Sequence, residues 1–145
     1  MNHPTPAQAP PLDPSYRMSL TVGAHSARHL RQILRLLLHA WRMPELTDGA
    51  GLALTELASN VIRHVPGRRC TILIARRPEG IRVEVDDKSP RLPRTADEGS
   101  ELTENNRGLL LIEGVTDRWG VARNPDPAAR PGKTVWFECD ALSED

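Results

Sequence analysis

The chain has 145 residues, with 19 acidic and 19 basic side chains that give a formal net charge of zero. This length suits a single domain with a hydrophobic core of its own. A chain without excess charge is not drawn electrostatically to nucleic acid or to an anionic membrane, so we expect neither as a direct partner.

The cysteines and the N-terminal stretch bear on the cellular compartment. Cys70 and Cys139 lie far apart in apolar, strand-like runs and form no CxxC pair, which favours buried free thiols in a reducing cytosol over a metal site or a disulfide. No apolar run reaches the roughly 18 residues that a membrane span needs. Residues 1–15 are polar, contain five prolines and have no signal-peptide core. We therefore expect a soluble cytoplasmic protein with a disordered tail at 1–15 and one folded domain at 16–145.

The first predicted elements are a strand and a helix. Alternating apolar residues predict a short strand over 18–22, and Ser26 can cap a helix that runs to about Trp41. The apolar stripe of this helix consists of Leu30, Ile33, Leu34, Leu37, Leu38 and Trp41. Its other faces carry Arg28, Arg31, Arg35 and Arg42. A solvated surface explains these arginines better than DNA binding does, because the chain has no excess of positive charge.

The second predicted helix begins near 44–47 and ends at His64. Its apolar face consists of Leu54, Leu57, Ala58, Val61, Ile62 and Val65. Glu56 and Asn60 are four residues apart and project from another side, with Arg63 and His64 one turn further on. By itself, such a carboxylate and carboxamide pair is more often part of a solvated helix face than of a functional site.

Two strands follow, at 70–75 and 81–85. Residues 86–107 then show no regular period, which in a small domain indicates either a functional lid or an incorrect assignment. A helix and two strands complete the chain, at 108–115, 119–122 and 134–139. The order predicts an α/β (α+β) two-layer sandwich, with the helices on one face of a mixed, mostly antiparallel sheet.

Three further places carry candidate polar groups. Asp87 follows the 81–85 strand, where a carboxylate can accept hydrogen bonds from a ring amine, although an Asp before Ser-Pro is more often a turn residue. Residues 105–108 (NNRG) lead into a helix, whose free N–H groups attract phosphate, but an ordinary loop-to-helix junction is the commoner case. The tripeptide GKT at 132–134 is by itself a turn and lacks the flanking residues of a phosphate-binding P-loop.

In their order and spacing these motifs resemble those of a known family. ELASNVIRH, VEVDDKSPRLP, NNRGLLLIEGVTDRWG and GKTVWFE resemble the successive N, G1, G2 and G3 boxes of the GHKL ATPase/kinase fold, or Bergerat fold. The likeness is greatest to the small anti-sigma-factor serine kinases of the RsbW/SpoIIAB type, especially their actinobacterial relatives, and covers about residues 19–139. It implies a histidine-kinase-like ATPase domain with an ATP lid at about 88–107.

The resemblance implies a role for each matching residue. Asn60 would ligate Mg²⁺ through its amide oxygen, and Glu56 would orient and deprotonate the attacking hydroxyl or water. Asp87 would accept the adenine amino group, and Thr134 would reach adenine or a water bound to it. The residues expected to hold the phosphates are Arg107, Gly108 and Leu109, the last through its backbone N–H. The other residues expected to line the ATP site are Arg63, His64, Ser89, Arg91 and Asn106.

Three of these residues depart from the family pattern. The G1 box usually has glycines where this chain has Ser89 and Arg91, and the first glycine of the usual GxG in the G2 box is Asn106 here. Asn tolerates left-handed backbone angles better than most residues, but its side chain stands where phosphate would approach.

The resemblance implies a cytoplasmic serine/threonine protein kinase that uses ATP and Mg²⁺. Such a protein would phosphorylate an antagonist protein and would regulate transcription by sequestering a sigma factor. The alternative is a non-catalytic docking module of the same fold with weak or no nucleotide binding, which Asn106 favours. Nucleic-acid binding through the arginines of the first helix is a distant third. A homodimer through the first helix and first strand is also implied by the family.

Overall fold

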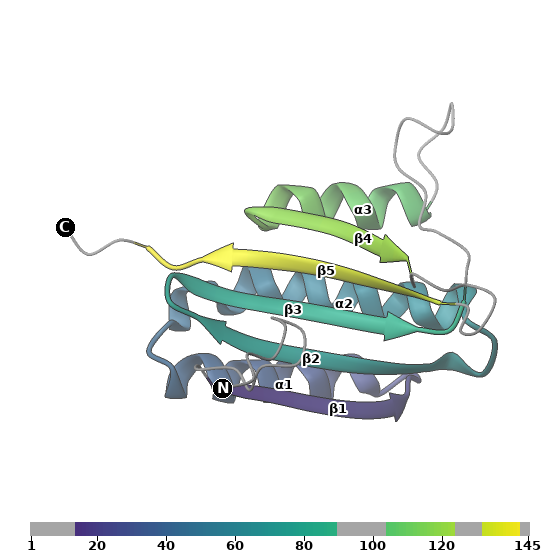
Figure 1. Cartoon of the computed structure of the whole chain (residues 1–145), viewed down its shortest axis with the longest axis horizontal. Helices are drawn as coiled ribbons and strands as arrows, with labels where there is room; N and C mark the ends of the chain where they lie inside the picture. Colours follow the sequence, from purple (N-terminus) through teal and green to yellow (C-terminus); the bar gives the residue numbers. More distant parts are fainter. Residues whose placement is uncertain (1–13, 90–103, 124–131, 143–145) are drawn as a thin grey trace, which may run out of the picture.

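The computed structural model describes residues 14–89, 104–123 and 132–142, and for residues 104–107 it describes the backbone only. Within these ranges, five strands form one sheet in the order β1-β2-β3-β5-β4 (Figure 1). The strands are β1 (Ser15–Thr21), β2 (Arg69–Arg77), β3 (Gly80–Asp87), β4 (Arg118–Arg123) and β5 (Lys133–Asp140). The helices are α1 (Ser26–Ala40), α2 (Thr47–His64) and α3 (Glu104–Val115), with short 3₁₀ turns η1 (Pro44–Leu46) and η2 (Pro66–Arg68).

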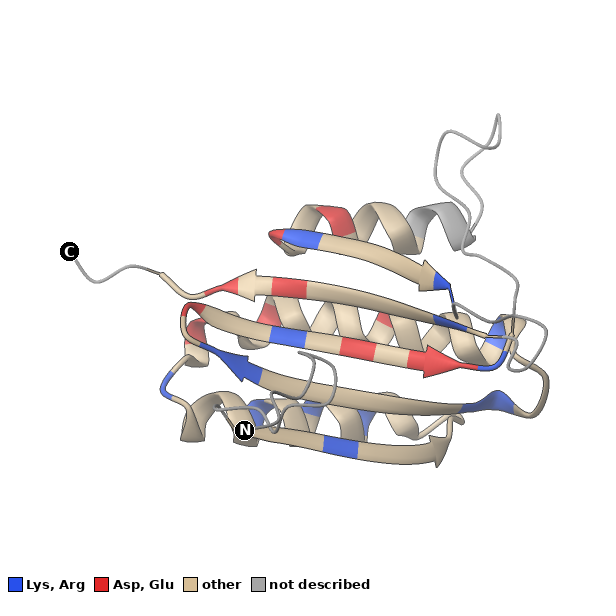
Figure 2. Cartoon of the chain, in the orientation of Figure 1, with Lys and Arg blue, Asp and Glu red and all other residues tan. Residues whose placement is uncertain are grey.

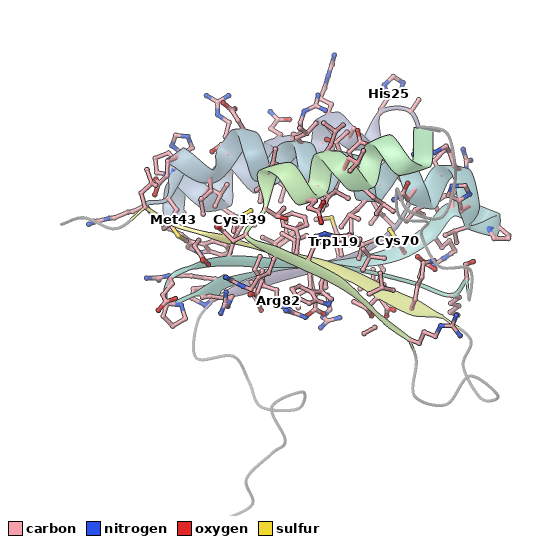
Figure 3. The ribbon with its side chains drawn as sticks, turned by 90° about the horizontal axis from the view of Figure 1, so that it is seen from above. His25, Met43, Cys70, Arg82, Trp119 and Cys139 are labelled. Atoms are coloured by element: carbon pink, nitrogen blue, oxygen red, sulfur yellow. The ribbon has the colours of Figure 1, made fainter. Side chains whose placement is uncertain are left out.

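The described helices lie on one face of the sheet, so the molecule has two layers. Figure 3, seen from above, shows the helices as one layer and the strands as the other. All the described strand pairs are antiparallel. The two-layer architecture expected from the sequence is therefore confirmed. None of the described helices combines the length and the apolar character that crossing a bilayer requires.

The core lies between the two layers, and the period of each element selects the residues that enter it. Every second residue of β3 faces the helices, and every fourth residue of one α1 stripe is buried under that helix. In these two elements the residues so buried are Ile81, Val83, Val85, Leu30, Leu34 and Leu38. Burial of each such side chain contributes roughly 1.5–3 kcal/mol. In α2 the predicted apolar face is buried with one correction: Ile62 remains 38% exposed.

Two predictions at the start of the domain need correction. β1 begins at Ser15, inside the stretch predicted to be a tail, because this residue pairs with Ala75 of β2; residues 1–13 lie outside the described part. Ser26 begins α1 but does not cap it, since its hydroxyl accepts a hydrogen bond from the Gly23 N–H at 2.8 Å. The residue in the N-cap position is His25, which makes no side-chain cap.

The sheet face away from the helices carries a network of charges. Glu138 of β5 pairs with Arg82 and Arg118 at 2.8 Å each and with Arg77 at 3.0 Å. Arg82 also stacks on Trp136, 4.3 Å from the ring centroid. Figure 2 shows the opposite charges side by side on β3, β4 and β5. Because three arginines cover Glu138, it is only 8% exposed although no described helix lies on this face.

Candidate functional site

One end of the sheet brings together the segments singled out from the sequence. β3 ends at Asp87 and β5 begins at Lys133, and these two residues are paired in the register. α2 ends at His64, shortly before β2, whose first residues pair with the end of β3. The start of α3 lies at the same end of the molecule, on the right in Figure 1. The ends of α2 and β3 and the starts of α3 and β5 therefore surround one region.

The central contact of this region is a buried ion pair. Lys133 Nζ lies 2.9 Å from Asp87 Oδ1, and the two side chains are 6% and 3% exposed. Strand alternation explains their position, because 81, 83 and 85 face the helices and 87 follows in phase. Along β5, 135, 137 and 139 are buried in the same way, and Lys133 is in phase with them.

Backbone groups fix the pair in place. The Ser89 N–H donates to Asp87 Oδ1 at 2.8 Å, and Lys133 Nζ donates to the Ser89 carbonyl oxygen at 3.3 Å. Gly132 has a φ of 152°, and a Cβ atom there would lie 2.5 Å from the Asp87 carbonyl oxygen. Glycine is therefore needed where β5 passes the end of β3.

Both cysteines are free and buried, as predicted, and Figure 3 shows them between the helices and the sheet. Burial, with the nearby charges of Asp87 and Asp86, raises the pKa of the Cys70 thiol to about 11. Burial, with the charges of Asp117 and Asp140, raises the pKa of Cys139 to about 12. These thiols are therefore protonated and unreactive near neutral pH.

The polar face of α2 places two predicted site residues together. Arg63 Nη2 donates to Asn60 Oδ1 at 3.0 Å, so the amide oxygen expected to bind Mg²⁺ accepts a hydrogen bond from the Arg63 guanidinium. Glu56 lies one turn before Asn60 on the same side. His64 closes the helix and is partly buried.

Glu56 also contacts the start of α3. A Cβ atom on Gly108 would lie 2.8 Å from Glu56 Oε2, so the carboxylate occupies the space that the glycine leaves open. Gly108 is buried. This contact joins the predicted catalytic carboxylate to the predicted phosphate-binding segment across two helices.

The start of α3 differs from the prediction. The helix begins at Glu104, four residues before the expected start at Gly108. The N–H groups without an intrahelical partner therefore belong to residues 104–107, and those of Gly108 and Leu109 lie inside the helix. Leu109 is 3% exposed and packs in the core. The side chains of Asn106 and Arg107 lie outside the described part.

Thr134 and Lys133 occupy opposite faces of β5. The Thr134 hydroxyl lies 3.2 Å from Asp86 Oδ1 on the face away from the helices, whereas Lys133 faces Asp87. Sequence reasoning assigned Thr134 to the site and treated Lys133 as a turn residue. The alternation of the buried residues 135, 137 and 139 is the signal that could have placed Lys133 correctly.

Comparison with known proteins identifies this arrangement. Residues 22–138 match the family model of the histidine kinase-like ATPase domain. The chain belongs to this family. Membership of this family implies ATP binding.

One curated relative and one solved structure are also similar to this chain. Over 79 residues the chain is 35% identical to the uncharacterized protein SCO4941 of Streptomyces coelicolor, which covers 52% of this chain and 75% of the relative. A chain in the crystal structure of the SiaB–SiaC complex from Pseudomonas aeruginosa is similar with a TM-score of 0.65 and 16% identity, covering 85% of this chain and 89% of that one. At this identity the likeness shows the fold, and the expected GHKL-type fold is confirmed.

The residues of this histidine kinase-like ATPase domain fit Mg²⁺ only as an ion shared with a nucleotide. Within the described ranges, no group of three or more His, Cys, Asp or Glu side chains could hold a metal ion. Asn60 offers one hard amide oxygen. Mg²⁺ commonly takes one or two protein oxygens and completes its shell with substrate phosphates and waters, so a single Asn suits an ion that binds with ATP.

The other predicted site residues and the lid are described only in part. Ser89 is buried beside Asp87, whereas Arg91 and most of the predicted lid at 88–107 lie outside the described part. A separate groove of about 550 Å³ lies between α1 and α2 and is lined by Arg28, Arg31, Arg35, Asp48, Gly51 and Thr55, among others. It contains none of the predicted ATP-site residues.

Proposed function

We propose that this histidine kinase-like ATPase domain is an ATP-dependent serine/threonine protein kinase of the anti-sigma type. It phosphorylates a serine of an antagonist protein and controls transcription by sequestering a protein partner. The observation that supports this best is the contact of Glu56 with Gly108, because it holds a carboxylate at the start of α3, one helical turn from Asn60.

The chain's residues divide the chemistry among them. Asp87, at the end of β3, accepts a hydrogen bond from the base, and the start of α3 holds the phosphates through its free N–H groups. Glu56 accepts the proton of the attacking serine hydroxyl. As the proton leaves, the serine oxygen forms a bond to the γ-phosphorus of ATP, and the bond from that phosphorus to the leaving ADP oxygen breaks. Mg²⁺, when bound with ATP at Asn60, offsets the negative charge of the phosphates.

Glu56→Gln tests the catalytic part because it preserves the shape of the side chain and removes the base. Transfer of radiolabelled phosphate to candidate antagonist proteins should fall by about a hundredfold or more, while the ATP dissociation constant measured by calorimetry should change by less than about threefold. Glu113→Gln, an exposed carboxylate on α3, is the matched control. A Glu56→Gln protein that transfers phosphate at the wild-type rate would remove Glu56 from this role.

Asn60→Ala tests the metal part. The wild type should bind ATP more tightly with Mg²⁺ than without, and the variant should lose most of this difference while still binding ATP. Equal Mg²⁺ dependence in both proteins would show that Asn60 does not ligate the ion.

The second candidate function is a non-catalytic docking module of the same fold. The groove between α1 and α2 favours it, because three arginines there offer charge-assisted contacts to an acidic protein segment, away from the ATP site. The solved complex to which the chain is similar also contains two proteins. ATP binding without phosphate transfer to any antagonist, combined with partner binding that Arg31→Glu abolishes, would favour this module over the kinase.

A further inference from the structure

Oδ2 of Asp87 accepts no hydrogen bond from any residue that the structure describes. Two donors reach the Asp87 carboxylate, Lys133 Nζ at 2.9 Å and the Ser89 N–H at 2.8 Å, and both go to the same oxygen, Oδ1. Among the residues that the structure describes, none donates to Oδ2. The buried carboxylate thus retains one oxygen for a donor on a ligand.

Lys133 retains a donor in the same way. An ammonium group has three N–H bonds, and its acceptors within the described ranges are Asp87 Oδ1 and the Ser89 carbonyl oxygen. One N–H therefore remains for a ligand. Since Asp87 and Lys133 are paired across neighbouring strands, this donor and the Oδ2 acceptor lie next to each other.

The amino edge of adenine has the complementary pattern, because its exocyclic amino group is a donor and the adjacent ring nitrogen N1 is an acceptor. We propose that Lys133 is a specificity-determining residue of the nucleotide site. Asp87 accepts a hydrogen bond from the amino group through Oδ2, and Lys133 donates one to N1. This inference rests on the proposed ATP site and adds a residue to it that neither the motifs nor the family assigned.

A structural role explains the pair less well. Burying two charges costs desolvation energy that their attraction barely offsets, so apolar residues of similar volume usually serve a fold as well. A carboxylate alone would recognise only the amino group. With the ammonium beside it, the site distinguishes a base that has both a donor and an adjacent ring acceptor.

The decisive probe is 1-deaza-ATP, in which a C–H group replaces N1. The wild type should bind it about tenfold to a hundredfold more weakly than ATP, the difference expected for one hydrogen bond from a charged donor. Lys133→Met should bind ATP more weakly by a similar factor and should no longer distinguish the two nucleotides. The measured quantity is the difference in affinity between the two nucleotides, and whether Lys133→Met removes it. A lysine that only stabilises the fold would leave this difference unchanged.

Two further measurements keep the test sharp. Arg17→Met is the matched control, because Arg17 is an exposed basic residue of the edge strand β1, two strands away from β3; its ratio between the nucleotides should equal that of the wild type. Lys133→Met leaves a buried carboxylate without its partner and could unfold the domain. If Lys133→Met unfolds, the double variant Lys133→Met/Asp87→Asn, which removes both charges, takes its place. Its ratio of ATP to 1-deaza-ATP binding is then compared with the wild-type ratio.

The outcomes separate this inference from the proposed function. A wild-type ratio near one, an unchanged ratio in Lys133→Met, or tighter ATP binding by that variant would overturn the role of Lys133 while leaving the ATP site intact. No ATP binding by the wild type would reject the proposed ATP site, and this inference with it.

Discussion

Oε2 of Glu56 lies 2.8 Å from the position that a Cβ atom would take on Gly108. The atom in the way is the end of a flexible side chain, so Gly108→Ala would displace the carboxylate and leave the backbone in place. Alanine also favours a helix interior over glycine by about 0.5–1 kcal/mol. We expect Gly108→Ala to lower phosphate transfer by about tenfold or more, with unchanged or higher stability in urea unfolding.

Gly114→Ala provides the control on the same helix, because a Cβ atom there would meet nothing within 4 Å. This variant should gain similar stability and keep full phosphate transfer. Full transfer by Gly108→Ala, or unfolding of it, would contradict the proposed importance of the Glu56–Gly108 contact.

Thr134→Val should leave ATP binding unchanged. The Thr134 hydroxyl lies 3.2 Å from Asp86 on the sheet face away from the helices, so its loss does not alter the region around Asp87. Calorimetry should give a dissociation constant within about twofold of the wild type, whereas Asp87→Asn should bind ATP at least about tenfold more weakly. A comparable loss in Thr134→Val would support the role that the family resemblance implies for this residue.

Acid should weaken the fold through Glu138. Burial alone would raise the pKa of Glu138, but hydrogen bonds from Arg118 and Arg82, with the charges of Arg77 and Arg82, outweigh burial and lower the pKa below its usual value. A lowered folded-state pKa means that this stability is fully present above the unfolded pKa, about 4.3 for Glu, and is lost as pH falls through the folded value.

Glu138→Gln should accordingly lower the free energy of unfolding by about 1–2 kcal/mol at neutral pH. The difference between variant and wild type should shrink as the pH falls below 4, which urea unfolding at several pH values would measure. Glu113→Gln should show no such difference. A constant difference across the pH range would mean that the charge of Glu138 is not the source of the stability.

Thiol reagents should not react with the folded protein near neutral pH. Cys70 and Cys139 are buried, and burial raises their pKa values to about 11 and 12, so almost no thiolate is present at pH 8. Absorbance with a chromogenic disulfide should report no thiol in the native protein and both thiols after denaturation. Rapid reaction of either cysteine would show that local opening exposes its strand.

Much of the fold follows from periodicity that a single sequence displays. The alternation of Ile81, Val83 and Val85 and the helical spacing of Leu30, Leu34 and Leu38 place the core correctly, because burial in two layers imposes those periods. Boundaries were harder to predict. The pairing of Ser15 with Ala75 depends on a partner strand far along the chain, and no local signal at residues 104–107 separates a helix start from a loop.

The site was predictable where a motif fixes a residue on one face of an element. Glu56 and Asn60 could be placed together for this reason. The partner of Asp87 could not be found from motifs, since Lys133 lies 46 residues further on and the strand register alone brings the two together. The contact between Glu56 and Gly108 likewise depends on how two helices pack, which spacing within either helix does not reveal.

Because Lys133 is buried, it is out of reach of reagents that react with lysine side chains at the protein surface. Of the two lysines in the chain, only Lys88 is exposed, and it directly follows Asp87. A dye, cross-linker or sensor surface coupled through lysine side chains would therefore attach next to Asp87 of the proposed nucleotide site. Coupling through the Ala40 end of α1 would instead hold the molecule and leave Lys88 unmodified.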